Sequence, residues 1–217
     1  MDAERATAEL KVIRELMERP IRCSTMSGAS GVIAGLVALA GVAADYFVSA
    51  RFERDEAMAI NILVWAGVFC TALAANVVLT RLREMQRGMP FWSGVKNRIL
   101  LTILPPFVLG VGLTAAVMHR WWVSVHGGPW MPNQWGLIPA IWMGCYGLAC
   151  WQVGEIKARE LRWLGAAFVL AALPTAAFWQ YSIPGVTEGH AAYWTLGATF
   201  GGFHIVYGII VWARHGG

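Results

Sequence analysis

Six long runs of apolar residues, separated by short charged or polar connections, occupy most of this chain. A helix needs about 20 mostly apolar residues to cross the hydrocarbon core of a bilayer, and all six runs are long enough. Hydrophobic residues make up 57% of the chain and charged residues only 14%, which argues against a soluble enzyme and, despite the net charge of +4, against a nucleic-acid-binding protein. The sequence therefore predicts an all-α, polytopic membrane protein with spans near residues 26–48, 58–79, 99–118, 135–153, 163–181 and 191–213.

The positive charges alternate from one side of the predicted spans to the other. Cytoplasmic connections of membrane proteins are enriched in Lys and Arg. With the N-terminus placed in the cytoplasm, fourteen of the 17 Lys and Arg residues fall on the cytoplasmic side, and the others are Arg51, Arg54 and Arg120. We therefore expect a multi-pass protein with both termini in the cytoplasm.

The segment before the first span is predicted to be a separate element. It covers residues 1–24, and the six-helix transmembrane domain follows as residues 25–217. Apolar residues recur in the first segment at helical spacing among charged ones, and Pro20 is expected to end or bend this helix. An amphipathic helix of this kind lies on the inner leaflet of a membrane or docks onto a cytoplasmic protein, and both interpretations stay open.

Three stretches of the sequence carry a resemblance to a known family. They are residues 9–41, 138–173 and 202–215, which begin with ELKVIREL, IPAIWMGC and GFHIVYGI. The chain resembles an uncharacterised family of bacterial six-span membrane proteins, whose genes often lie beside those of winged-helix regulators. The resemblance implies a bacterial inner-membrane protein in a regulatory or stress setting. Some members are labelled carotene-cleaving oxygenases, but those enzymes are large propellers that hold iron with His ligands, and this chain has neither the length nor the strands.

A polar side chain at bilayer depth is costly and is a candidate functional group. The clearest is His204, near the middle of the sixth run, on a helical face that it shares with glycines. A face of small residues admits a neighbouring helix backbone or, alternatively, a flat ligand. Three interpretations stay open: an interhelical hydrogen bond, an axial ligand of haem or a chlorophyll-type pigment, and a proton relay or solute site. The residues beside His204 in this candidate site are Gly201, Tyr207 and Gly208.

A second set of candidates lies on the predicted outer side. Imidazole and carboxylate groups can bind zinc or copper, and such residues gather there from separate segments. They show no ligand spacing, so solvated interfacial groups stand as the alternative to a metal site. The set comprises Asp45, His119, His126, Glu188 and His190.

Small residues predict close helix packing in the first and last spans. Ser27, Gly31 and Gly35 form a small-residue stripe in the first span, and Gly197 extends the glycine face of the last. In a six-helix protein we expect such stripes to pack within the monomer. Two asparagines of the second span, Asn61 and Asn76, are predicted to bond across helices.

Three prolines are predicted to kink their helices, because proline removes a backbone donor. Pro105 and Pro106 lie in the third span and Pro174 in the fifth. Broken helices in matching places of two halves are typical of secondary transporters, and these positions do not match. A small pore stays open as an alternative.

The sequence contains no recognisable catalytic constellation. A P-loop, HExxH and GxSxG are absent, and no lysine lies inside a predicted span. We therefore expect a non-enzymatic integral membrane module that senses a ligand, regulates, or acts as a partner or scaffold subunit. The alternatives are a pigment- or haem-binding subunit with His204 as axial ligand, and a small-solute channel or carrier. Expected partners are the lipid bilayer, further copies of the chain or a membrane complex, and a cytoplasmic protein at residues 2–24, with no nucleic acid.

Overall fold

The computed structural model describes residues 27–52, 54–86, 88, 92, 94–129, 134–156, 158–178 and 194–215. Among these residues, six helical segments are long and apolar enough to cross a membrane, which confirms the predicted number of spans. They are α2 (Gly28–Arg51), α3 (Arg54–Gln86), α4 (Gly94–Val125), α5 (Leu137–Ile156), α6 (Arg159–Phe178) and a last span, Trp194–Arg214. The predicted amphipathic helix of residues 1–24 lies outside the described residues.

The last span is not a uniform α-helix. Its first half contains the π-helical segment η1 (Gly197–Phe203), and the α-helix α8 (His204–His215) follows directly. Short π-helical segments are uncommon and occur frequently at functional sites. The sequence analysis predicted a long helix here and gave no sign of this irregularity.

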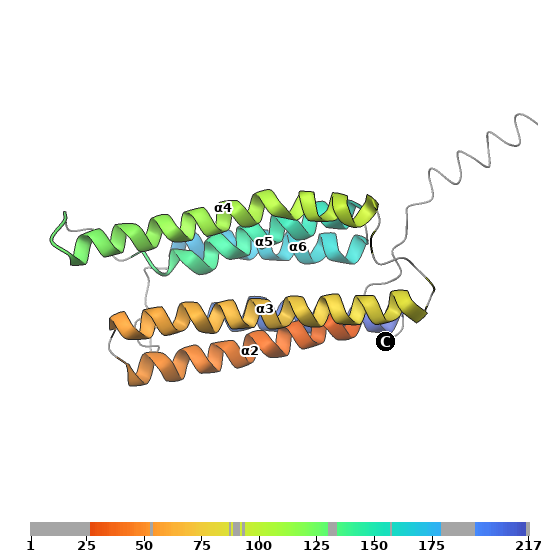
Figure 1. Cartoon of the computed structure of the whole chain (residues 1–217), viewed down its shortest axis with the longest axis horizontal. Coiled ribbons are helices and arrows are strands. Elements are labelled where there is room, and N and C mark those ends of the chain that lie inside the picture. The colour runs from red at the N-terminus through yellow and green to blue at the C-terminus, as the bar shows by residue number, and fades with distance from the viewer. Residues whose placement is uncertain are drawn as a thin grey trace, which may run out of the picture.

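The helices form two groups, which Figure 1 shows as two separate layers. In the first group, α2 packs between α3 and the last span, and we call these three the α2 half. In the second, α5 packs between α4 and α6, and we call these the α5 half. The last span packs on α6 and so connects the halves, whereas α3 and α4 do not pack along their lengths.

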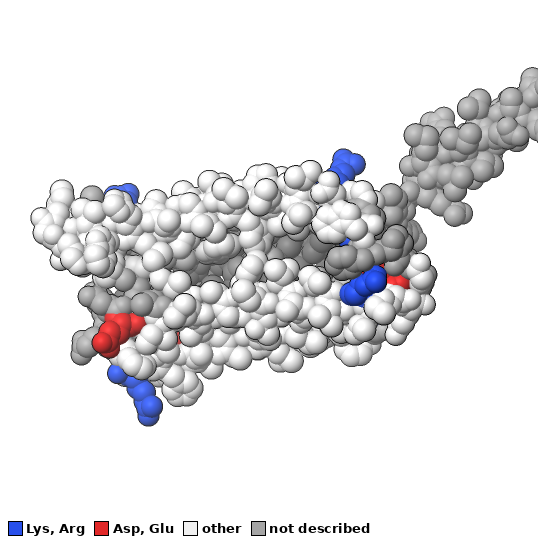
Figure 2. Space-filling view, in the orientation of Figure 1, with Lys and Arg blue, Asp and Glu red and all other residues white. Residues whose placement is uncertain are grey.

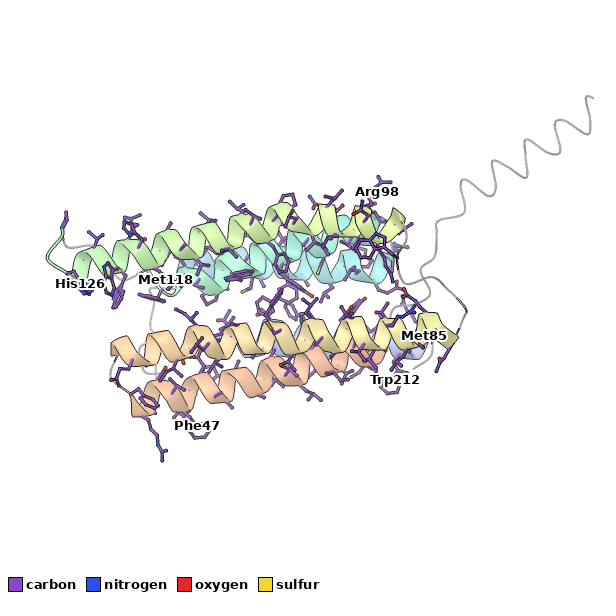
Figure 3. The ribbon with its side chains drawn as sticks, in the orientation of Figure 1. Phe47, Met85, Arg98, Met118, His126 and Trp212 are labelled. Atoms are coloured by element: carbon purple, nitrogen blue, oxygen red, sulfur yellow. The ribbon has the colours of Figure 1, made fainter. Side chains whose placement is uncertain are left out.

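Charged side chains lie towards the two ends of the helices. On the face shown in Figure 2, the middle of the molecule carries no Lys, Arg, Asp or Glu. Because successive spans run antiparallel, alternate connections lie at the same end, as the positive-charge pattern requires. Arg98 and Met85 are at one end and His126 is at the other (Figure 3).

Two helices are longer than the predicted spans. The runs at 58–79 and 99–118 lie within α3, with 33 residues, and α4, with 32 residues, and these helices extend beyond the runs by up to seven residues at an end. A helix of this length extends about 50 Å at 1.5 Å per residue, well beyond a hydrocarbon core of about 30 Å. The extra turns carry charged side chains such as Arg83, which the apolar-run criterion cannot include.

The predicted kink sites lie inside helices. Pro105 and Pro106 are within α4, which continues on both sides of them, and Pro106 is buried. Pro174 is within α6, which ends four residues later at Phe178. The prolines therefore do not end or split α4 at the middle of the bilayer.

Candidate functional site

His204 lies at the seam between the two halves, and both nitrogens of its ring are engaged. Nε2 lies 2.6 Å from the hydroxyl oxygen of Tyr146 on α5, and Nδ1 lies 2.8 Å from the backbone carbonyl oxygen of Phe200. A carbonyl oxygen can only accept, so Nδ1 carries a proton and donates it. Nε2 of the neutral ring then accepts the hydroxyl proton of Tyr146. The residue is 8% exposed, and each of its two ring nitrogens has a hydrogen-bond partner.

The irregular helix explains why the imidazole can bind its own backbone. The amide of His204 donates to the carbonyl of Gly201, three residues earlier, and not to that of Phe200, four residues earlier. The carbonyl of Phe200 is therefore available to the imidazole. Thr199 makes a similar bond, in which its hydroxyl donates to the carbonyl of Thr195 over 2.7 Å. Side chains thus supply bonds where η1 departs from the regular ladder.

Aromatic rings enclose His204. The rings of Tyr146 and Phe168 have their centroids 5.3 Å and 5.4 Å from that of His204, and Phe200 stacks over it at 6.2 Å. Phe168, from α6, is 0% exposed and is the centre of the core cluster shared by α5 and α6. Among the described residues the site is therefore a buried contact lined by aromatic rings, with an interhelical hydrogen bond between Tyr146 and His204.

The joint continues towards the C-terminal end of the last span. Cys150, one turn along α5 from Tyr146, is buried in the core cluster against which Tyr146 packs. Tyr207, which the sequence placed beside His204, packs against the same core cluster. At the helix ends, Nη1 of Arg214 donates to Glu160 over 3.2 Å. Polar groups of the last span therefore meet α5 and α6 at more than one depth.

The glycine face of the last span is covered by α2. A Cβ atom added to Gly208 would lie 2.5 Å from the backbone nitrogen of Val32, and one added to Gly35 would lie 2.7 Å from the carbonyl oxygen of Gly201. Gly31 faces Gly208 in the same way. The predicted small-residue stripes therefore pack against each other within the monomer. Gly197 is looser, since an added Cβ would be in ordinary contact with the side chains of Leu39, at 3.7 Å, and Val42, at 3.9 Å.

The start of that interface also uses polar groups. Ser27 is buried, and its carbonyl oxygen accepts the Ser30 hydroxyl over 2.7 Å. Asn76 of α3 donates to the Ser30 hydroxyl over 3.4 Å, as the sequence analysis predicted for a bond across helices. The first span, α2, therefore contacts the last span on one side and is hydrogen-bonded to α3 on another.

The arrangement does not fit a haem or a chlorophyll-type pigment on His204. An axial ligand needs a free ring nitrogen, whereas Nε2 is bonded to Tyr146. A flat ring system needs an open face, whereas the glycines that could provide one contact the α2 backbone. Binding would therefore require the joint to separate.

The outer set of predicted metal ligands is not brought together among the described residues. Asp45 is on α2, whereas His119 is on α4 in the other half. His126 stacks on Trp122 with centroids 3.7 Å apart, and its Nδ1 is 2.9 Å from the carbonyl oxygen of that residue. No group of three His, Cys, Asp or Glu side chains suited to a metal ion occurs in the described part of the chain. Glu188 and His190 lie outside it.

Sequence reasoning found His204 but missed its partners. Tyr146 and Phe168 are ordinary members of apolar runs, and nothing in their spacing indicates which helix they face. A signal was present in Tyr146, the one hydroxyl-bearing aromatic residue near the middle of the fourth run.

No family model, no curated protein and no solved structure matches the chain.

Proposed function

We propose that the protein is a non-enzymatic sensing or regulatory module of the bacterial inner membrane, which responds to a ligand through the relative position of its two halves. The observation that carries this proposal is the uneven packing of the bundle. Each half packs closely within itself, while the halves meet mainly where the last span contacts α6 and where Tyr146 binds His204. Such an arrangement has one joint and one open side, which suits a two-state element.

The open side lies between α3 and α4. Near the middle of these helices the rings of Phe69 and Phe107 are in contact, with centroids 5.6 Å apart. Near one end they are joined by an ion pair, in which Nζ of Lys96 lies 2.6 Å from Glu84. An apolar molecule dissolved in the bilayer can replace the ring contact without breaking a hydrogen bond. A ligand changes the equilibrium between two arrangements only if it binds one of them better, and insertion between α3 and α4 provides that difference.

We propose that the cytoplasmic end of the molecule transmits the change to a partner protein. The charge pattern supports an orientation with both termini inside, and the ion pair of Glu84 with Lys96 then lies on the cytoplasmic side. A change in the distance between α3 and α4 alters this end of the molecule. From the sequence alone, residues 2–24 and the basic connections assigned to the same side are the proposed contact for a cytoplasmic partner.

The proposal is tested by measuring distances with pairs of spin labels. One pair, at Leu73 of α3 and Leu104 of α4, spans the open side; both side chains are exposed on the described surface. The control pair, Leu36 of α2 and Leu73, lies within one half. Labels are attached to cysteines introduced after Cys23 and Cys70 are replaced by Ser, since Cys145 and Cys150 are buried.

The probe is an organic extract of the source membranes, added to the labelled protein in nanodiscs. We expect the extract to change the distance distribution of the first pair and leave that of the control pair unchanged. If no fraction of the extract alters the first pair, the sensing proposal is wrong. If both pairs change together, the two halves are not the moving parts.

A further inference from the structure

The hairpin of α2 and α3 brings four polar side chains together near its connecting turn. Asp45 and Ser49 are one helical turn apart on α2, and Asn61 and Trp65 are one turn apart on α3. Nε1 of Trp65 donates to Oδ2 of Asp45 over 3.1 Å, and Nδ2 of Asn61 donates to the Ser49 hydroxyl over 3.2 Å. Residues four apart share a helix face, so the two bonds form adjacent rungs between the helices.

Asp45 is deeply buried for a carboxyl group. Its residue exposure is 4%, and Gly41, one turn before it, lets α2 approach Val68 and Trp65 of α3 closely. Burial of a carboxylate is costly unless a positive charge or several donors compensate it. Trp65 supplies one neutral donor, to Oδ2. Oδ1 has no hydrogen-bond partner.

A second buried side-chain oxygen, on α3, also has no hydrogen-bond partner. The Asn61 amide uses its nitrogen to donate to Ser49, and its oxygen, Oδ1, is also buried without a hydrogen-bond partner. Two buried side-chain oxygens, Oδ1 of Asp45 and Oδ1 of Asn61, therefore lie on facing turns of the two helices without a hydrogen-bond partner.

The charged side chains that the structure describes near the site do not compensate Asp45. Arg51 is exposed at the end of α2, two residues beyond Ser49, and side chains two apart on a helix do not face each other. Glu56, near the start of α3, is exposed and negative. No ion pair of Asp45 is found among the described residues.

We propose that Asp45 and Asn61 form a binding site for a monovalent alkali cation such as Na⁺. Oxygen donors select hard cations over zinc or copper, which prefer nitrogen and sulfur. One carboxylate with a neutral amide oxygen becomes neutral with a single positive charge, whereas a divalent ion would leave an excess charge beside a buried group. This donor set differs from the imidazole-rich set that the sequence indicated, and only Asp45 belongs to both.

The cation would join α2 to α3 independently of the joint at His204. It would hold the hairpin near its turn, while the Tyr146–His204 bond holds the seam between the halves. The site therefore does not depend on the proposed sensing function, and either proposal can fail alone.

The test measures binding of radioactive sodium to the full-length protein in detergent, together with thermal unfolding. Sodium replaces N-methylglucamine at constant ionic strength and constant pH. We expect saturable binding of one Na⁺ per chain and a higher unfolding temperature in sodium. The Asp45→Asn variant is expected to lose the binding and the temperature shift, and Asn61→Ala to bind more weakly. Asn76→Ala, which alters the other end of the same hairpin, is expected to keep both.

Direct binding by the unaltered protein keeps the test informative where Asp45→Asn fails to fold. Absence of saturable sodium binding overturns the proposal, as does binding that survives Asp45→Asn. A response to pH with none to sodium also overturns it, because the carboxyl group would then hold a proton in place of the cation.

Discussion

The hydroxyl of Tyr146 donates to Nε2 of His204 over 2.6 Å and so joins α5 to the last span inside the apolar layer. Two ion pairs, Lys96 with Glu84 and Arg214 with Glu160, also join the halves, and both lie towards one end of the helices. The Tyr146–His204 bond is thus the connection at depth. If this bond is broken, water cannot reach the buried site to replace either partner, so the bond favours one packing of α5 against the last span.

Replacing Tyr146 with Phe should destabilise the protein by about 1–3 kcal/mol, because Nε2 of His204 would be left buried without a donor. A double-mutant cycle with His204→Phe isolates the bond from the effects of altered volume. Interhelical hydrogen bonds in membranes couple by about 0.6 kcal/mol on average and up to about 1.7 kcal/mol, and we expect a value at the upper end. Unfolding in mixed micelles measures it, and strictly additive effects would contradict the assignment.

Glycine at position 208 is required by the contact with α2. The Gly208→Ala variant should be destabilised by about 1–3 kcal/mol, the usual cost of overpacking, because the new methyl group meets backbone atoms that cannot rotate away. Gly112→Ala on α4 is the matched control, since nothing lies within 4 Å of its added Cβ. That variant should be neutral or more stable by up to about 1 kcal/mol from helix propensity. Equal unfolding midpoints for the two variants would show that α2 and the last span do not pack as described.

The six spans were predictable because each is a direct consequence of apolar length. The sequence also indicated His204 and the small residues of the first and last spans, since polar and small residues stand out in an apolar helix. It could not indicate that Gly208 faces Gly28 and Val32, because which helices become neighbours depends on the packing of the whole bundle. The π-helical segment was equally hidden. Phe200 and His204 pack there against side chains of α5 and α6, and no local residue pattern encodes that packing.

The purified protein is expected to show no absorption band in the Soret or red region. Both nitrogens of His204 are engaged, and the adjacent glycines are packed on α2, so no axial position is available in this arrangement. The measurement is an ultraviolet–visible spectrum of protein extracted gently from its native membrane. A visible band that disappears in His204→Ala would contradict this and establish the pigment or haem alternative.

The orientation in the membrane can be tested with two single cysteines. His126 and Asn97 are both exposed and lie at opposite ends of α4. In a background with Cys23 and Cys70 replaced by Ser, a membrane-impermeant maleimide should label His126→Cys on intact cells, because the basic connections are held in the cytoplasm. Asn97→Cys should be labelled only after the cells are opened. The reverse pattern would invert the topology.

The ion pair between α3 and α4 should contribute far more to stability than a similar pair at the same end. The side chain of Glu84 is 4% exposed and that of Lys96 28%, whereas Glu155, paired with Arg162, is 54% exposed. Removing one partner of a buried pair costs about 3–5 kcal/mol, and we expect the lower end for Lys96→Met because the lysine is partly solvated. Glu155→Gln should change stability by less than about 1 kcal/mol. Unfolding midpoints in one detergent compare the two variants directly, and equal shifts would mean that Glu84 is solvated and that α3 and α4 are not joined at this end.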